Sequence, residues 1–295
     1  MKKLIAMLLV LVMVASCFAA CGDTDDKSNL QDSASNNTQG SNNNEDATQN
    51  VSKDNSSNSQ KSDMDYILSK GTLIVGITDY APMDFKDDNG EWTGFDAEFA
   101  RLVGEKLGVE IIFQEIQWSS KFFELEGKTI DCIWNGMTIS DEVLLNTNCS
   151  DAYVKNAQVV VMKSAKAAQY TDVASMSELL FAVEEGSAGE QALKDNDLSN
   201  YTPVYDQATA LMEVAAGTAD ACIIDLTMAN AMTGAGTSYD QMVIVLEMTS
   251  EVYGVGFRKE SDMTAKFNEI MKELMEDGTL DALAEKYQLT LVKGE

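Results

Sequence analysis

The chain has 295 residues, with 48 acidic and 21 basic side chains and a formal net charge of −27. This balance argues against nucleic-acid binding, because phosphate contacts need Lys and Arg. The chain contains no His, which excludes His-based triads, the common zinc sites and the usual proton shuttle near neutral pH. Carboxylate catalysis stays open, and neither a cofactor nor a metal is expected.

Residues 1–21 are predicted to be a secretory signal, because a short basic start precedes an apolar run over residues 4–20. Two alanines stand directly before Cys21 in a pattern that resembles a bacterial lipobox. We therefore expect Cys21 to be lipidated and to become the mature N-terminus. Cys17 fits the same loose pattern, and an ordinary cleaved signal is a further alternative. An anchored protein of this kind works at the extracellular face of the cytoplasmic membrane or in the periplasm.

Residues 22–62 are rich in Asn, Ser, Asp, Gln and Thr and contain almost no apolar side chain. Such a composition buries too little apolar surface to offset the entropy of ordering a backbone. We predict a disordered polar tether between the lipid and the folded part.

From residue 72 onward, short β-rich runs alternate with helical patterns. Strands are predicted over residues 73–77, 109–116, 130–134, 158–162, 180–183, 203–205, 221–224 and 242–246. Helices are predicted over residues 96–107, 119–125, 188–193, 207–216, 228–232 and 263–287, the last with a break at Gly278. This alternation predicts an α/β architecture with largely parallel sheets, and its two series suggest two lobes. Ligands of such sheets bind beyond the carboxyl ends of the strands, so the residues that follow strands are the functional candidates.

Three cysteines lie in the part predicted to fold. Cys132 and Cys222 sit inside apolar strand-like runs and are expected to be buried thiols, whereas Cys149 is expected in a loop. No CxxC spacing supports a redox or metal site, although an odd count in an exported protein leaves a reactive thiol open.

Several sequence motifs follow one another in an order that is informative about the family. They include GFDAEFARLVGEKLG from residue 94, GMTIS from residue 136, VEEGSAGEQAL from residue 183 and YGVGFRKE from residue 253. Their order resembles that of the family 3 solute-binding proteins, the polar-amino-acid receptors of ABC importers. The resemblance implies a small-molecule ligand, expected to be an amino acid, and an ABC permease in the membrane as partner. It also implies a monomer that captures its solute without catalysis.

The resemblance implies a two-lobed periplasmic-binding-protein-like fold, with two mixed sheets flanked by helices and joined by two hinge strands. Lobe 1 would comprise residues 63–158 and 253–295, and lobe 2 residues 159–252. Hinge strands near residues 157–162 and 249–256 would let the lobes close over a ligand.

Two aromatic residues match family positions that form the walls of the pocket. Tyr80 would stack on the ligand side chain and Trp118 would form a second wall, because an aromatic ring gives contact area at low entropy cost. Packing within the protein is the alternative for both rings. Asp79, beside Tyr80, would accept a bond from an ammonium group.

The loop after the strand at residues 130–134 matches the family's ligand-binding loop. The resemblance implies that Asn135, Gly136 and Thr138 lend backbone groups and a hydroxyl to the amino and carboxylate groups of the ligand. Glycine allows a close approach of the main chain, and Thr can donate or accept.

Two further candidates lie in the second lobe. Ser187 and Glu190 form a capping box at the start of a helix, so Ser187 is expected to be its N-cap. The helix N-terminus around Ser187 and Ala188 would also accept a ligand carboxylate. Asp225 matches the family Asp that pairs with the α-ammonium group, with a solvated or capping Asp as the alternative.

Val143 departs from the family pattern. Family members typically carry an Arg there, which clamps the α-carboxylate with two charge-assisted hydrogen bonds. Losing a charged bond of this kind costs about 1.5–3 kcal/mol, and neither Arg101 nor Arg258 stands in a matching place. A receptor for an amine without a carboxylate, a degenerate weak binder, a dehydratase-like enzyme and a sensor are therefore weighed as alternatives to the amino-acid receptor.

Overall fold

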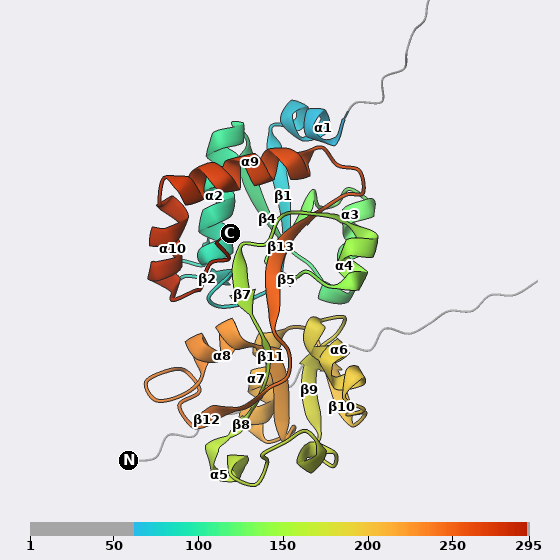
Figure 1. The fold of residues 1–295 in the computed structure, drawn as a ribbon, viewed down its shortest axis with the longest axis vertical. Coiled ribbons are helices and arrows are strands. Elements are labelled where there is room, and N and C mark those ends of the chain that lie inside the picture. Colours follow the sequence, from blue (N-terminus) through green and yellow to red (C-terminus); the bar gives the residue numbers. More distant parts are fainter. Residues whose placement is uncertain (1–61, 294–295) are drawn as a thin grey trace, which may run out of the picture. The chain divides into compact units, whose positions relative to one another are not determined.

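The computed structural model describes residues 62–293 of the chain. The predicted signal and lipidation site therefore lie outside the described residues, and so does the predicted tether except for Ser62, the N-cap of the first helix. Two main sheets form two lobes, each with its own helices (Figure 1). We call the part built on the six-stranded sheet lobe 1 and the part built on the five-stranded sheet lobe 2.

The sheet of lobe 1 is mixed. Its strands are β1 (Thr72–Ile77), β4 (Glu110–Glu115), β5 (Cys132–Thr138), β6 (Asn148–Cys149), β7 (Val154–Asn156) and β13 (Glu251–Phe257). The strands β4, β1 and β5 run parallel to one another, while β13 pairs antiparallel with β5, β6 and β7. A small hairpin of β2 (Phe85–Lys86) and β3 (Trp92–Thr93) is separate from this sheet.

Helices cover both faces of the lobe 1 sheet. They are α1 (Asp63–Lys70), α2 (Phe95–Leu107), α3 (Lys121–Glu126), α4 (Asp141–Asn146), α9 (Met263–Glu276) and α10 (Thr279–Tyr287). Successive residues of β5 point to opposite faces, as a strand requires. Trp134 packs between Phe99 and Phe267, with ring centroids 4.9 and 5.0 Å away, whereas Ile133 belongs to the apolar cluster around α3. This packing fixes the end of β5, where the site begins.

Lobe 2 has a mixed sheet in the order β10-β9-β11-β8-β12. Its strands are β8 (Gln158–Lys163), β9 (Phe181–Glu184), β10 (Tyr201–Val204), β11 (Ala221–Asp225) and β12 (Met242–Glu247). Its helices are α5 (Ser164–Ala167), α6 (Ala188–Asp195), α7 (Gln207–Ala216) and α8 (Leu226–Met232). β9, β10 and β11 are parallel, and β8 is antiparallel to both of its neighbours. The parallel strands end toward lobe 1 (Figure 1).

The chain crosses between the sheets twice, through β7–β8 and through β12–β13 (Figure 1). The two crossings are hydrogen-bonded side by side, since Met248 N donates to Gln158 O at 2.8 Å and Gln158 N donates to Thr249 Oγ1 at 2.8 Å. Lobe 1 therefore contains both ends of the described chain, while lobe 2 is one continuous segment.

The two-lobed α/β fold with mixed sheets is confirmed, whereas the expectation of largely parallel sheets is wrong. Antiparallel pairing arises because each crossing strand enters its new sheet against the direction of its neighbours. The predicted strands and helices are present with shifted ends. The helices α1, α4 and α5, the strands β6 and β7 and the β2–β3 hairpin were not predicted, because each of them is short.

Three cysteines are free among the described residues. Cys132 and Cys222 are buried, as predicted, and Cys149 lies in the short strand β6 instead of a loop. Burial raises the pKa of Cys149 to about 11 and that of Cys222 further above its ordinary value. These thiols are therefore protonated at neutral pH and poor nucleophiles.

Candidate functional site

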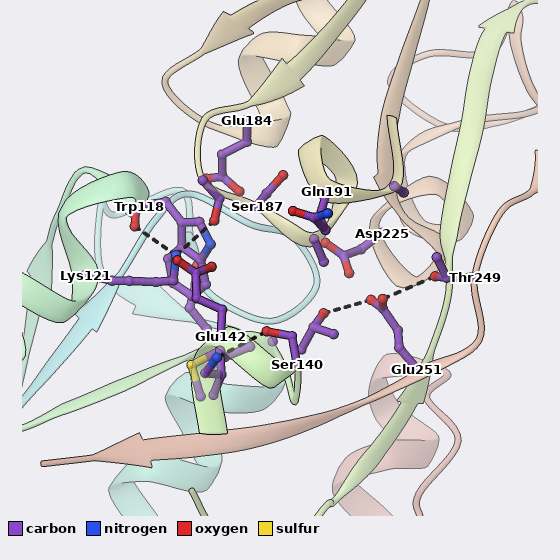
Figure 2. Close-up of a pocket in the computed structure, with 18 of the residues that line it drawn as sticks. Trp118, Lys121, Ser140, Glu142, Glu184, Ser187, Gln191, Asp225, Thr249 and Glu251 are labelled. Carbon is purple, nitrogen blue, oxygen red and sulfur yellow. Dashed lines mark hydrogen bonds between the residues drawn. The ribbon is translucent and has the colours of Figure 1, made fainter. Parts of the chain in front are cut away.

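A cavity of about 570 Å³ is lined by residues of both lobes (Figure 2). Lobe 1 contributes the end of β5, the 3₁₀ turn at Trp118–Ser120 and the helices α3 and α4. Lobe 2 contributes the ends of β9 and β11, one side of α6 along its whole length, and the first residue of α7. The cavity thus lies beyond the carboxyl ends of parallel strands, where α/β sheets bind ligands.

The charge of this lining is strongly acidic. Six carboxyl side chains and a single lysine line the cavity. Neither arginine contributes, since Arg258 bonds to Asp63 at 2.8 Å and to Asp131 at 3.1 Å, and Arg101 donates to the Trp92 carbonyl at 2.6 Å. The lining favours a cationic group in the solute.

Asp225 and Glu251 form a pair of carboxylates on one side of the cavity (Figure 2). They share donors, because Gln158 Nε2 lies 3.0 Å from Asp225 Oδ1 and 2.8 Å from Glu251 Oε1, and Asn156 Nδ2 also donates to both. The Tyr253 hydroxyl donates to Asp225 Oδ1 at 2.8 Å. Burial and then the charge of Glu251 raise the pKa of Asp225 to about 8. An ammonium group here would stabilise both carboxylates in their charged form.

The three predicted residues of β5 line the cavity, but the structure already engages their polar groups. Asn135 Oδ1 accepts from Thr78 N at 3.0 Å and its Nδ2 donates to Asp84 at 2.8 Å, so this side chain braces lobe 1. Gly136 N donates to Asp96 at 2.6 Å. The Thr138 hydroxyl donates to Glu251 at 2.8 Å, and this bond orients the carboxylate pair.

Tyr80 and Asp79 do not line the cavity. The Tyr80 ring is buried under Gly136, where an added Cβ would come within 2.6 Å of the ring, and Gly136 has a φ of 54°. The Tyr80 hydroxyl lies 2.5 Å from Thr227 Oγ1 of lobe 2, while the Asp79 side chain is exposed. Tyr80 therefore supports the site from beneath and joins the two lobes.

Trp118 lines the cavity on the opposite side from Asp225 (Figure 2). Val143 also lines it and belongs to the same buried apolar cluster as Trp118 and Met137. The position that the family pattern reserves for Arg is thus part of an apolar wall. Its place at the first turns of α4 is fixed by Ser140, whose Oγ accepts from Val143 N at 3.2 Å.

Lys121 is the lysine of the lining, and sequence reasoning missed it. Its side chain is buried, and its Nζ donates to the Gly186 carbonyl of lobe 2 at 2.9 Å and lies 5.0 Å from the Trp118 ring centroid. Burial lowers its pKa, with a partial offset from nearby carboxylates. A lysine in a short helix normally indicates an exposed face, so no sequence signal marked it as buried.

Helix α6 begins at the cavity with the predicted cap. Ser187 Oγ accepts from Glu190 N at 3.1 Å, and Glu190 Oε2 accepts from Gly186 N at 2.9 Å. Ser187 and Ala188 line the cavity, so the partially positive end of the helix lies in its wall.

Glu184 is a second missed residue of the lining. It is the last residue of β9, its side chain is 3% exposed, and its Oε1 accepts no hydrogen bond. Burial and the charges of Asp225 and Asp206 raise its pKa well above the ordinary value, against a smaller opposing effect of Lys121. A charged residue at the end of an otherwise apolar strand was the available signal.

The lobes touch at the rim of the cavity. Glu185 Oε2 accepts from Gln117 Nε2 at 3.2 Å and from Ser119 Oγ at 3.3 Å. Gly186 has a φ of 74°, and an added Cβ would lie 2.9 Å from Ser119 Cα. Only glycine allows this close approach of the two lobes.

Within residues 62–293, no helix has the length and apolar character needed to span a bilayer. In the same range, no cluster of three or more His, Cys, Asp or Glu side chains has the arrangement of a metal site.

Comparisons with known proteins agree on the family. The model of the bacterial extracellular solute-binding proteins, family 3, matches residues 73–290. The chain is 29% identical over 225 residues to the L-cystine-binding protein TcyJ of Escherichia coli, covering 75% of this chain and 84% of that protein. It is 28% identical over 228 residues to the arginine-binding extracellular protein ArtP of Bacillus subtilis, covering 74% and 86%.

Solved structures give the same answer for the fold. A mutant of ArgBP from T. maritima has a TM-score of 0.71 at 30% identity, covering 76% of this chain and 98% of that chain. An ancestral amino-acid-binding protein described as a precursor of cyclohexadienyl dehydratase has a TM-score of 0.69 at 31% identity, with the same coverage. The prediction of solute binding without catalysis is confirmed by the family, and the chain belongs to the bacterial extracellular solute-binding proteins of family 3.

Proposed function

We propose that this protein captures an amino acid between its two lobes and delivers it to an ABC permease. The observation that carries the proposal is the pair formed by the buried Asp225 and the half-buried Glu251, which share their donors and line the cavity. A buried carboxylate beside a second carboxyl group is costly unless a cation neutralises it, and the α-ammonium group supplies one. The relatives named for cystine and arginine binding support an amino acid as solute.

The α-carboxylate needs a partner other than Arg. The first turn of α6, at Ser187 and Ala188, presents backbone amides and the positive end of the helix to the cavity. This arrangement supports binding of the carboxylate by lobe 2, while Val143 and Trp118 contact the aliphatic part of the solute. With Val143 in place of an Arg clamp, the α-carboxylate is bound more weakly.

Closure of the lobes would proceed about the two crossings β7–β8 and β12–β13. These are the only connections between the two sheets within residues 62–293. The contacts of Glu185 and Gly186 of lobe 2 with lobe 1, which include the bond from Lys121, would break on opening. Solute binding and rim contact would then stabilise the same closed state.

A thermal-shift panel of the common amino acids, with amines and small peptides, tests the proposed function. A solute at 100 times its dissociation constant adds about 2.7 kcal/mol to the free energy of unfolding, which is readily measured as a rise in Tm. No shift with any α-amino acid would contradict the proposed ligand class. Turnover of a candidate acid would indicate an enzyme instead.

The proposal includes a lipid anchor at Cys21, a monomeric state and a position at the extracellular face of the membrane. The basic start, the apolar run and the paired alanines before Cys21 support it. Metabolic labelling with a fatty acid should mark the wild type and Cys17→Ser but not Cys21→Ser. The reverse pattern would assign the anchor to Cys17. Light scattering of the soluble part should give the mass of one chain.

A further inference from the structure

Glu184 is a buried carboxyl group of the cavity wall, and one of its two oxygens has no hydrogen-bond partner among the described residues. The side chain is 3% exposed, lines the cavity and has an oxygen, Oε1, that accepts no hydrogen bond. A carboxylate that is buried with an unpaired acceptor oxygen is costly, because it has lost its hydration without gaining a donor. A solute that brings a donor to this part of the cavity wall would stabilise Glu184.

Among residues 62–293, no cation forms an ion pair with Glu184. Lys121 shares the cavity, yet no ion pair joins the two, and the lysine donates to the backbone carbonyls of Gly186 at 2.9 Å and Trp118 at 3.4 Å. The other charges that act on Glu184 are the carboxyls of Asp225 and Asp206, which repel its charged form. This part of the lining therefore carries acidic groups whose charge no basic side chain balances by an ion pair.

The position of Glu184 relative to Asp225 follows from the sheet. Val183 of β9 pairs with Ile223 of β11 in parallel register; Glu184 directly follows the first, and Asp225 lies two residues beyond the second. The backbones of the two acidic residues are thus about one strand spacing, roughly 5 Å, and one residue apart. One small solute can reach both carboxyl groups.

Apolar groups line the same cavity. Trp118, Val143 and Ala188 all face it (Figure 2 labels Trp118). Such a wall favours methylene groups between two polar ends of the solute, because burying apolar groups away from water is favourable.

We infer that the solute carries two cationic nitrogen groups joined by a short aliphatic chain, the first held by Asp225 and Glu251 and the second by Glu184. The inference rests on the proposed function for the first nitrogen and adds the second. The shared chemistry has two sources: a dibasic amino acid or a diamine. Glu184 is then the residue that selects against solutes with a neutral side chain.

Three related probes separate these possibilities by calorimetric dissociation constants. Ornithine and norvaline differ only in the second ammonium group, and putrescine is ornithine without the carboxylate. The homologous set of lysine, norleucine and cadaverine covers a chain longer by one methylene. In the wild type, the dicationic probe of one set should bind about tenfold to hundredfold more tightly than its neutral partner, as a charged hydrogen bond predicts.

Glu184→Gln keeps the shape of the side chain and removes its charge. The preference for the dicationic probe should fall to less than about threefold in this variant. Glu178→Gln is the matched control, because Glu178 is an exposed carboxyl of lobe 2 outside the cavity, and the preference should be unchanged. Melting curves without solute check that both variants fold.

The outcomes divide cleanly. Equal affinities of ornithine and norvaline, and of lysine and norleucine, would overturn the inference while leaving the proposed amino-acid receptor intact. So would a preference that Glu184→Gln does not change. Binding of none of the six probes would overturn the inference, whereas the proposed function would be decided separately by the panel of the common amino acids. Tight binding of putrescine or cadaverine would support the inference with a diamine as source, whereas binding of ornithine or lysine alone would assign it to a dibasic amino acid.

Discussion

Asp225 makes solute binding depend on pH in a defined direction. Its carboxyl is 4% exposed, and burial together with the Glu251 charge raises its pKa to about 8 in the solute-free cavity. An ammonium group binds the charged carboxylate, so below pH 8 the proton must leave before the cation binds. Each pH unit below the pKa then weakens binding tenfold, or 1.36 kcal/mol. At pH 8 about half of the Asp225 carboxyls are charged, so from pH 8 to pH 6 the affinity should fall about fiftyfold, which is about 2.3 kcal/mol.

Titration calorimetry in buffers of different ionisation enthalpy measures this linkage directly. With the probe that binds best in the amine and amino-acid panel, about one proton should be released at pH 6 and fewer above pH 8. A second proton would come from Glu184 if the probe is dicationic, because the pKa of that carboxyl is also raised by burial.

A matched pair of variants tests whether the pH dependence of binding comes from Asp225. Asp141→Asn removes an exposed carboxyl at the rim of the same cavity and should keep the pH slope of the wild type. Asp225→Asn should lose the slope together with most of the affinity. A wild-type affinity that is flat between pH 6 and 8, with no proton release, would refute the reasoning.

Three other changes have expected results. The folded-state pKa of Asp225 lies above its ordinary value of 3.8, so this carboxyl destabilises the fold increasingly as the pH rises from about 4 to 8. The Tm of Asp225→Asn minus that of the wild type should therefore be larger at pH 8 than at pH 5. An equal difference at both pH values would argue against this effect. Gly186→Ala should weaken solute binding at least tenfold, because the added Cβ would lie 2.9 Å from Ser119 Cα and hold the lobes apart. Gly217→Ala is the control for backbone strain, because Gly217 also has a positive φ but its added Cβ would have no neighbour nearer than 3.6 Å. Equal losses of affinity in both variants would contradict an effect on closure. Val143→Arg should tighten binding of an α-amino acid about tenfold or more by restoring a carboxylate clamp, whereas unchanged calorimetric affinity would show that the native site neutralises the carboxylate without it.

Most of the fold could be predicted from the sequence, because its elements have clear local signals. Residues 207–216 and the tail around Gly278 show helical periodicity, and the structure has helices there. The Ser187 cap was also predictable, since capping depends on residues only three apart. The direction of β8 and β13 in their sheets was not, because antiparallel pairing follows from tertiary crossings that leave no local pattern.

The site was predictable only in part. Asp225, Thr138 and Trp118 follow or end strands and line the cavity, in keeping with the rule that ligands lie beyond strand ends. Tyr80 obeys the same rule in sequence, yet its ring turns beneath Gly136, and the direction of a side chain depends on packing. Glu184 and Lys121 were missed because a charged residue is normally taken to be exposed, and its burial depends on the opposite lobe.

The two crossings of the chain between the lobes also determine the order in which the two sheets can be completed during synthesis. Lobe 2 is one continuous segment, so all its strands are present once residue 247 has been synthesised. Lobe 1 lacks β13 until residues 251–257 follow, and β13 is the strand that pairs with β5, β6 and β7. A chain synthesised from its N-terminus therefore completes the sheet of lobe 1 only after that of lobe 2. Exposed strand edges are prone to aggregation, so the pairing of β13 with β5 also protects the unfinished part of lobe 1.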